Sequence, residues 1–387
     1  MSLMTPEREA IRDSAREFAM KEVLPVANEL DKVKGDIPMS LREKMAELGY
    51  FGILIPEEHG GLGLGVFEYV LVTEELARAW MSVASIVARG NGLGGGFSEE
   101  QKRSYLPRVA RGEFLGAFAL SEPNAGSDVA NISCRARRDG DEWVITGQKM
   151  WCTFADGADY IVVIARTDER VDPKRRHAGL SMFMFEKERG SLPEGISGNP
   201  VNKIGYHGWK TWDLSFDDFR VPAAALLGEE GRGFYQAMQF LDVARAHTAA
   251  RSVGLARGAL EDSIRYAQER VQFGHPIGDF QAIRFKLGQM AAEIEAARQL
   301  THFVADAIDT GKRCDQEASM AKWFASEMSE RAASEAIQIH GGYGYTTDFA
   351  VERYWRDARL TKIFEGTSEI QLRIISDRLL GPLKARA

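Results

Sequence analysis

The apolar residues of this chain change their spacing twice, and these two changes restrict the fold more than any single motif does. Over residues 5–112 the apolar positions, as in SLREKMAELGYFGI, recur roughly every 3.6 residues, which predicts helices. Between about 114 and 222 they form short alternating or β-rich runs such as EWVITG and YIVVIAR, which predict a mainly antiparallel β unit. From 228 onward the chain is Ala-rich and again helical in pattern.

The order of helices, β unit and helices indicates an α+β protein with more than one core, as a length of 387 residues also suggests. A last helix is expected after Ser368, and longer helical stretches predict an antiparallel bundle over 232–270, 281–310 and 315–339. The expected domains are an N-terminal helical domain, a middle β domain and a C-terminal four-helix bundle, over residues 1–113, 114–224 and 225–387.

Composition excludes several classes of protein. The net charge is −7 and no basic stripe occurs, which argues against a nucleic-acid binder. No apolar run approaches membrane-spanning length and no basic-then-apolar leader is present, so we expect a cytoplasmic protein without membrane insertion. Neither a disulfide framework nor a thiolate metal cluster is expected from three widely separated cysteines, Cys134, Cys152 and Cys314.

A glycine pattern at Gly90–Gly95 matches GxGxxG, the dinucleotide-binding fingerprint. That fingerprint must follow a strand and open a helix. Here it follows a helical pattern and leads into the polar segment SEEQKRSYLP, so we interpret it as a loop that ends a helix. The histidines never recur at helical ligand spacing, so no metal site is predicted.

Three turn segments are candidates for ligand contact. LSEPNAGSD (120–128) follows an apolar strand and offers backbone N–H groups to a polar ring or phosphate, although an ordinary turn would look the same. In ERVQFGHPIGDFQAI (269–283) we expect a helix to end at Phe273-Gly274 and the next to open at Gln281, which makes either a ligand site or a plain interhelical corner. In IQIHGGYGYTTDF (337–349) a helix ends before two glycines.

A fourth segment, KIFEGTSEIQ (362–371), interrupts a helical region at Glu365 and Gly366. Ser368 and Gln371 have the spacing of a capping box, which predicts that a new helix begins at Ser368. Glu365 then lies in the connection, either as a functional carboxylate or as a solvated charge in a turn.

Five segments follow one another in this order: LSEPNAGSD, GQKMWCTFAD, ERVQFGHPIGDFQ, QIHGGYGY and FEGTSEIQ. Together they resemble the signatures of the acyl-CoA dehydrogenase family of flavoproteins, and the resemblance covers essentially the whole chain. The resemblance implies a helical N-terminal domain, a β-barrel-like middle domain and a C-terminal four-helix bundle. It also implies FAD as the cofactor, acyl-CoA as the substrate, an electron-transfer flavoprotein as the electron acceptor and a homotetramer built as a pair of dimers.

Each cofactor contact is carried over by the resemblance. The flavin would be contacted by side chains of the middle domain and of the last helix, namely Phe118, Leu120, Ser121, Ser127, Trp151, Thr153, Thr367 and Glu369. FAD in this family lies across a subunit interface. Its adenosine diphosphate portion would therefore contact residues of the neighbouring subunit, namely Arg270, Gln272, Phe273, Gln281, Gln338, Gly341 and Gly342.

The resemblance also assigns the chemistry. Members remove the proton α to a thioester carbonyl while the β hydride passes to the flavin, which gives a trans-2-enoyl thioester. Glu365 matches the family's base, and desolvation is expected to raise its pKa. Some relatives carry the base immediately before the arginine that corresponds to Arg245, but this chain has Ala244 there.

Substrate contacts are expected from Ser127, Gly366, Asp242 and Arg245, although an ion pair between Asp242 and Arg245 is the alternative for the last two. Arg89 would lie at the end of the acyl slot and bind an acidic acyl tail.

The position of Arg89 and the function of the protein each have alternatives. Arg89 could instead point outward or pair with Glu99 or Glu74. An acyl-CoA oxidase, a flavin monooxygenase on the same scaffold or a non-catalytic helical binding protein are the alternative functions.

Overall fold

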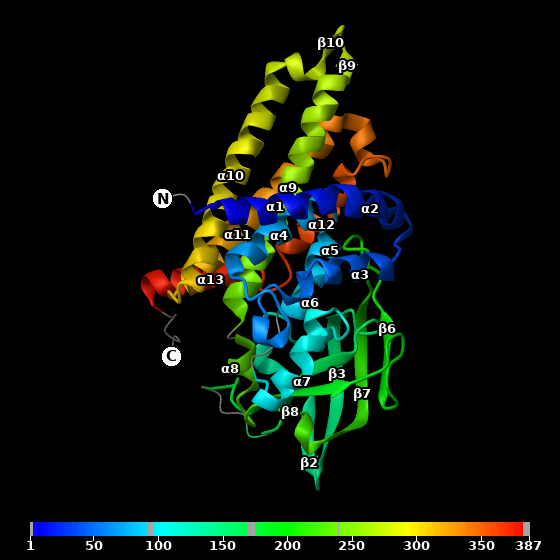
Figure 1. Ribbon diagram of the computed structural model, residues 1–387, viewed down its shortest axis with the longest axis vertical. Coiled ribbons are helices and arrows are strands. Elements are labelled where there is room, and N and C mark those ends of the chain that lie inside the picture. Colours follow the sequence, from blue (N-terminus) through cyan, green and yellow to red (C-terminus); the bar gives the residue numbers. More distant parts are fainter. Residues whose placement is uncertain (1–2, 92–95, 169, 171–174, 239, 382–387) are drawn as a thin grey trace.

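The computed structural model describes residues 3–91, 96–168, 170, 175–238 and 240–381. Its elements form three parts along the long axis of the molecule. A long hairpin of α9 (Leu241–Glu269) and α10 (Gln281–Asp309) reaches one end, N-terminal helices cross the middle, and a β-sheet forms the other end (Figure 1). No helix among the described residues is both long and apolar enough to cross a bilayer.

The N-terminal helices surround one helix that is buried on nearly every side, α4. Thr5 caps the first helix through its side chain, 3.3 Å from the N–H of Arg8, and Pro6 is its first residue. α4 packs against both α1 and α9, so it joins the N-terminal helices to the long hairpin. The α-helices of this part are α1 (Pro6–Phe18), α2 (Leu24–Leu30), α3 (Met39–Glu47), α4 (Val66–Ala79), α5 (Met81–Ile86), α6 (Ala88–Asn91) and α7 (Glu99–Ala110).

The sheet has the strand order β6-β7-β3-β2-β4-β5-β8, with β1 beside β4. It is mainly antiparallel, but β1 and β2 both run parallel to β4. β4 is buried throughout because its alternate residues enter two different cores: Ile161 and Val163 enter one, Val162 and Ile164 the other. The strands are β1 (Gly116–Ala119), β2 (Arg135–Asp139), β3 (Glu142–Thr153), β4 (Tyr160–Arg166), β5 (Leu180–Glu186), β6 (Ile196–Pro200), β7 (Thr211–Pro222) and β8 (Leu226–Leu227). β8 lies beyond residue 224 and pairs with β5, so the sheet extends past the expected end of the middle domain. The domain boundaries at 113 and 224 stay predictions.

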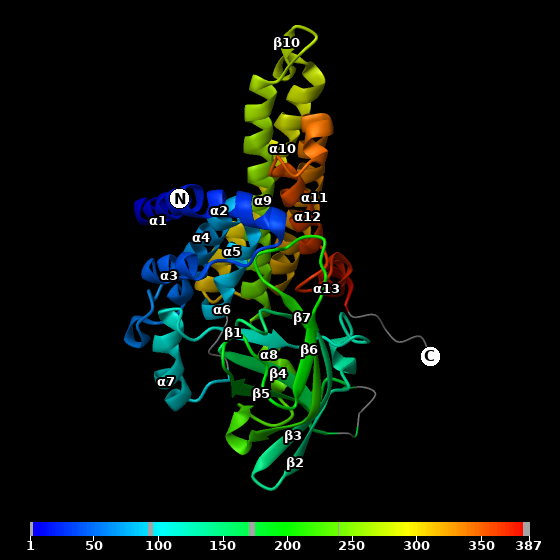
Figure 2. The ribbon, with the colours of Figure 1, turned by 90° about the vertical axis from the view of Figure 1, so that its right-hand side faces the viewer.

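The C-terminal part differs from the expected helices in two places. The stretch expected at 232–270 consists of two helices, and a further helix, α12, was not predicted as a separate element. The remaining helices are α8 (Gly233–Met238), α11 (Asp315–His340), α12 (Val351–Thr361) and α13 (Ser368–Leu380). Figure 2 shows α11 beside the α9–α10 hairpin, and both α12 and α13 pack against α11.

The corner between α9 and α10 corrects a sequence prediction. α9 ends at Glu269 and not at Phe273-Gly274. A short hairpin of β9 (Val271–Gln272) and β10 (His275–Pro276) follows, with φ values of 53° at Phe273 and 85° at Gly274. Two consecutive residues with positive φ form the tight turn whose twist suits a two-residue hairpin, and a helix cannot continue through it.

α13 begins at Ser368 as predicted, but the predicted capping box is wrong. Thr367, which has extended backbone, caps the helix through its side chain, 3.3 Å from the N–H of Ile370. Ser368 is already helical, and its hydroxyl instead donates to Glu327 at 2.7 Å. Gln371 donates its amide to the carbonyl of Gly366 at 3.0 Å and so supports the turn before the helix.

A buried acidic pair lies where α12 meets the N-terminal helices. Asp357 accepts a hydrogen bond from the N–H of Tyr206 at 2.6 Å, and Asp31 pairs with Arg356 at 2.5 Å. Each carboxylate has one oxygen that is buried without a hydrogen-bond partner among the described residues. Burial, and then the charge of Asp31, raise the pKa of Asp357 to about 7.

We therefore expect the free energy of unfolding to fall between about pH 4 and pH 7. A raised pKa in the folded state means that the native protein binds the Asp357 proton more tightly than the unfolded chain does. This contribution is complete below the unfolded pKa and is lost as the pH rises through about 7. Urea-unfolding midpoints across this range should show the slope, and Asp357→Asn should flatten it; an unchanged slope in the variant would contradict the assignment.

Candidate functional site

Glu365 lies in the connection between α12 and α13, in a backbone conformation that is uncommon for a residue with a side chain. Its φ is 54°, and Gly366 follows with φ 89°. The turn is held by Lys322 of α11, whose ammonium donates to the carbonyl of Gly366 at 2.7 Å. Such backbone strain persists only where the surrounding structure imposes it, and it concentrates at functional sites.

The carboxylate of Glu365 is held by two residues of α9 that lie one helical turn apart. Arg251 Nη2 lies 2.8 Å from each carboxylate oxygen, and the Thr248 hydroxyl donates to one of them. The Glu365 side chain keeps 35% of its surface exposed, whereas the Arg251 side chain keeps 1%. The Glu365 side chain is therefore partly exposed, and its carboxylate is paired with a buried cation.

This ion pair overturns the expectation that the pKa of Glu365 is raised. Burial does raise it, but the charge of Arg251, with smaller contributions from His247 and Thr248, outweighs burial and lowers the pKa to about 2. Neither Arg251 nor Thr248 was singled out from the sequence. The available signal was a lone arginine in the run HTAARSVG, where small and apolar residues predict a buried helix face.

Further side chains complete what we call the Glu365 cluster. Arg251 Nη1 donates to the Ser85 hydroxyl at 2.8 Å, and its guanidinium lies 4.7 Å from the centre of the Phe364 ring. His247 stacks on Tyr69 at 5.0 Å, and burial lowers its pKa to about 3, so its ring is neutral near pH 7. The cluster comprises Tyr69, Ser85, Tyr206, His247, Thr248, Arg251, Phe364 and Glu365.

Arg89 pairs with neither of the carboxylates considered for it. Glu74 pairs with Arg257 and Arg298, and Glu99 pairs with Lys102. The Arg89 guanidinium instead lies 5.1 Å from the centre of the Trp209 ring, and its Nε is buried without a hydrogen-bond partner in the described part of the chain. Its charge acts on the pKa values of three members of the Glu365 cluster, Tyr69, Tyr206 and His247, which places it beside the cluster.

The segment 120–128 lies against β3, so several residues expected at the flavin come together. Lys149 Nζ donates to the carbonyl of Leu120 at 3.0 Å, and the N–H of Met150 donates to the carbonyl of Ser121 at 2.8 Å. A buried ion pair that the sequence did not predict, between Glu122 and Lys149 at 2.9 Å, anchors this segment. Glu122 also accepts hydrogen bonds from the backbone of Ser133 and Cys134.

Two large apolar residues of the sheet, Phe118 and Trp151, are exposed. The Phe118 and Trp151 side chains are 36% and 55% exposed, which is unusual for large apolar groups on strands of a packed sheet. Trp151 has a positive φ of 65°, and Thr153 shares a hydrogen bond with Thr211 at 3.0 Å. Ser127 and Glu369 are exposed, and Thr367 is half-buried. These residues fit an aromatic cofactor laid against the sheet.

The residues expected to hold the adenosine diphosphate portion lie elsewhere. Arg270 and Gln272 line a hollow of about 480 Å³ with Gly341, Gly342 and Tyr343. A Cβ added at either glycine would meet no atom within 4 Å, so this backbone is open to a ligand. Phe273 is 91% exposed in the adjoining hairpin turn, and Gln281 and Gln338 are exposed. The α9–α10 end lies opposite the sheet (Figure 2), so the two sets of residues do not converge within one chain.

Asp242 and Arg245 form the ion pair that was the alternative to a role in substrate binding, with 2.8 Å between Arg245 Nη1 and Asp242 Oδ1. Arg245 is buried, and its Nε has no hydrogen-bond partner among the described residues. The pair lies near the start of α9, one to two turns before Thr248 and Arg251.

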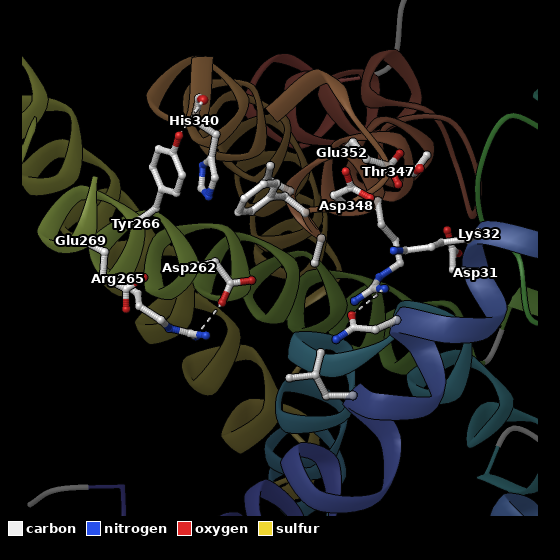
Figure 3. A pocket seen from close by; sticks show the side chains of 16 residues that line it. Asp31, Lys32, Asp262, Arg265, Tyr266, Glu269, His340, Thr347, Asp348 and Glu352 are labelled. Atoms are coloured by element: carbon white, nitrogen blue, oxygen red, sulfur yellow. Dashed lines mark hydrogen bonds and ion pairs between the residues drawn. The ribbon is translucent and has the colours of Figure 1, made fainter. Parts of the chain in front are cut away.

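Another hollow, of about 290 Å³, lies between α2, α9 and the start of α12 (Figure 3). Its walls include Tyr266 and His340, which stack at 4.2 Å, and Asp262, which pairs with Arg265 at 3.0 Å. No member of the Glu365 cluster lines it. This hollow is therefore separate from the candidate site.

Comparisons with known proteins agree with this architecture. Three family models match in chain order: the acyl-CoA dehydrogenase N-terminal, middle and C-terminal domains, over residues 5–113, 117–219 and 231–380.

Two relatives and one solved structure illustrate the similarity. The (2S)-methylsuccinyl-CoA dehydrogenase of Cereibacter sphaeroides is 43% identical, covering 97% of this chain and 70% of its own length. The caffeyl-CoA reductase-Etf complex subunit CarC of Acetobacterium woodii is 41% identical, covering 97% of this chain and 98% of its own. The structure of butyryl-CoA dehydrogenase from Megasphaera elsdenii has a TM-score of 0.91 at 36% identity, covering 97% of this chain and 99% of that one.

These matches span all three parts of the molecule and confirm the expected fold, a helical N-terminal domain, a middle β domain and a C-terminal helical domain. The chain therefore belongs to the acyl-CoA dehydrogenase family, whose members are FAD-dependent oxidoreductases.

Proposed function

We propose that this protein dehydrogenates an acyl-CoA thioester between its α and β carbons to give the trans-2-enoyl-CoA, with Glu365 as the base. The observation that carries this is the partly exposed Glu365 side chain, which lies at a strained helix break. The other position for a base, immediately before Arg245, is occupied by Ala244, which cannot accept a proton.

Glu365 and Gly366 have separate roles in the proposed reaction. Glu365 receives the α-proton, and its own backbone N–H is proposed to donate to the thioester oxygen and stabilise the negative charge that develops there. Gly366 lets the substrate approach this backbone without a Cβ in the way. FAD, when bound, supplies the acceptor for the β hydride. Phe118, Trp151 and Thr153 are proposed to orient it.

The acyl group is proposed to carry an acidic tail. Arg89 is partly buried beside the Glu365 cluster and forms no ion pair among the described residues, which leaves it available for an anionic ligand. The similarity to a (2S)-methylsuccinyl-CoA dehydrogenase, whose name specifies an acidic acyl group, supports the same substrate class.

We also propose an electron acceptor, an oligomeric state and a compartment for this protein. An electron-transfer flavoprotein accepts the electrons, which the similarity to a subunit of a reductase-Etf complex supports. The protein is a homotetramer, a pair of dimers, and lies in the cytoplasm. Three free cysteines, all buried, suit a reducing compartment.

An anaerobic titration of the purified protein with butyryl-, octanoyl- and glutaryl-CoA tests the reaction class. We expect the flavin absorbance to bleach with at least one of them and the enoyl-CoA to appear. Reoxidation of the bleached flavin by oxygen at the rate of turnover would favour an oxidase instead. A colourless protein, or a flavin that no acyl-CoA bleaches, would overturn the proposal.

Arg270→Ala should weaken FAD retention and subunit association together, because Arg270 is proposed to bind the diphosphate of the neighbouring subunit's FAD. FAD content after gel filtration and the elution volume measure the two effects. Arg265→Ala, on the exposed surface of α9 just before Arg270, serves as the control and should change neither. An Arg270 variant that stays fully flavinated and assembled would contradict the placement across subunits.

A further inference from the structure

The ion pair between Arg251 and Glu365 conflicts with a base that must accept a proton. Both carboxylate oxygens lie 2.8 Å from Arg251 Nη2, and the Thr248 hydroxyl donates to one of them. Hydrogen bonds to the charged form of a carboxylate make it a weaker base. An arginine stays protonated in proteins, so the pair cannot be relieved by proton transfer. Glu365 therefore has to leave Arg251 before it can act efficiently.

Arg251 cannot follow Glu365, because it is fixed on its other sides. Its side chain is 1% exposed, Nη1 is bonded to Ser85 at 2.8 Å, and the guanidinium stacks over Phe364. When Glu365 moves away, a buried cation is left without a counter-ion, which is strongly unfavourable.

No protein anion in the described residues around the pair could replace Glu365. The charged and titratable side chains that face it come from four elements: Tyr69 from α4, Tyr206 from the segment before β7, His247 from α9 and Lys322 from α11. Glu327 of α11 also acts on Lys322, but it is paired with Lys362 at 2.7 Å. Arg89 lies nearby and is also a cation. The replacement anion must then come from outside the chain.

We infer that a carboxylate on the acyl chain of the substrate replaces Glu365 on Arg251 and so releases the base. Arg251 then binds the substrate and, by releasing Glu365, controls the base, and the substrate is a short dicarboxylic acyl-CoA. This inference rests on the proposed function, and it assigns the carboxylate of a short acyl chain to Arg251 in place of Arg89. A neutral acyl-CoA can bind, but it leaves Glu365 on Arg251 and turns over slowly.

The distances limit the length of the acyl chain. A productive base lies about 3–3.5 Å from the reacting α-carbon. Arg251 Nη2 lies 2.8 Å from the Glu365 carboxylate before the exchange. Glu365 stays on the same turn when its side chain moves away, so the guanidinium remains within roughly 8 Å of the α-carbon. Acyl groups of succinyl or glutaryl type place their carboxylate in this range. Longer diacids carry it too far along the slot, where Arg89 rather than Arg251 would meet it.

Binding measurements test the exchange without any need for turnover. In Glu365→Gln the competing carboxylate is gone, so glutaryl-CoA should bind at least tenfold more tightly than to wild type by isothermal titration calorimetry. Butyryl-CoA should bind the two proteins equally, since its tail does not use Arg251. Equal affinity of glutaryl-CoA for both proteins would overturn the inference.

Turnover by Arg251 variants gives a second test. Wild type should turn over glutaryl- or methylsuccinyl-CoA with a kcat at least tenfold above that for butyryl-CoA. Arg251→Gln should remove this preference and Arg251→Lys should keep part of it, with Arg265→Gln as the control that changes nothing. A preference for butyryl-CoA in wild type, left unchanged by Arg251→Gln, would refute the exchange while the dehydrogenase assignment stands.

The pH profile of kcat/KM separates an effect on the base from general damage. Wild type should show no acid limb from Glu365 in the pH range where the protein is folded, because the pKa of Glu365 lies near 2. Without Arg251, burial raises this pKa, so Arg251→Gln should lose activity as the pH falls through the new value. Lys322, whose pKa burial lowers to about 8, titrates on the alkaline side in both proteins. An acid limb at the same pH in both would count against the inference.

Discussion

Glu365→Gln is expected to lower turnover by about 10²–10⁴-fold while FAD content and fold are unchanged. Glutamine has nearly the shape of glutamate and can still accept hydrogen bonds from Arg251 and Thr248, but it cannot take the α-proton. Nothing on the described part of the chain offers a second carboxylate at this turn, since Glu327 is paired with Lys362 and Glu369 is exposed on α13.

The measurement is steady-state turnover with a saturating artificial electron acceptor, together with the flavin absorbance of the purified variant. Asp377→Asn, which removes a carboxylate from the far end of α13, is the matched control and should retain wild-type activity. Near-normal turnover by a fully flavinated Glu365→Gln protein would show that another residue is the base.

Lys149→Met is expected to lower the free energy of unfolding by about 3–5 kcal/mol. The Lys149 side chain is fully buried, and it bonds both the Glu122 carboxylate at 2.9 Å and the Leu120 carbonyl at 3.0 Å. Methionine fills a similar volume but leaves Glu122 as a buried charge without its counter-ion. Because Glu122 also holds the backbone of residues 133 and 134, the segment 120–128 should loosen as well.

Urea unfolding followed by tryptophan fluorescence measures the change. The control is Arg220→Met on β7, which breaks an exposed ion pair with Glu142 and should leave the midpoint unchanged. The double variant Glu122→Gln/Lys149→Met should recover part of the loss, since neither partner is then a buried unpaired charge. A Lys149 variant as stable as wild type would mean that water or solvent ions neutralise Glu122.

Local patterns in the sequence indicated the helical and β parts and several helix ends, but not α12 or the hairpin of β9 and β10. Apolar spacing separated the helical parts from the β unit, and Thr5-Pro6 and the glycines after His340 stand at real helix ends. These features act over a few residues, through hydrogen bonds and backbone angles that neighbouring residues set, so a sequence shows them directly. The position of Glu365 at a helix break was predictable for the same reason.

Tertiary structure alone decided the electrostatics of the site. Glu365 and Arg251 are 114 residues apart, and only the packing of α9 against the α12–α13 turn brings them within 2.8 Å. Burial at Glu365 was expected to raise its pKa, and the direction reversed because a buried cation from another helix outweighs desolvation. The Glu122–Lys149 pair and the position of Arg89 over Trp209 depend in the same way on distant segments. Coulomb interactions depend on distance in space and on local burial, and neither quantity is encoded in any short stretch of the chain.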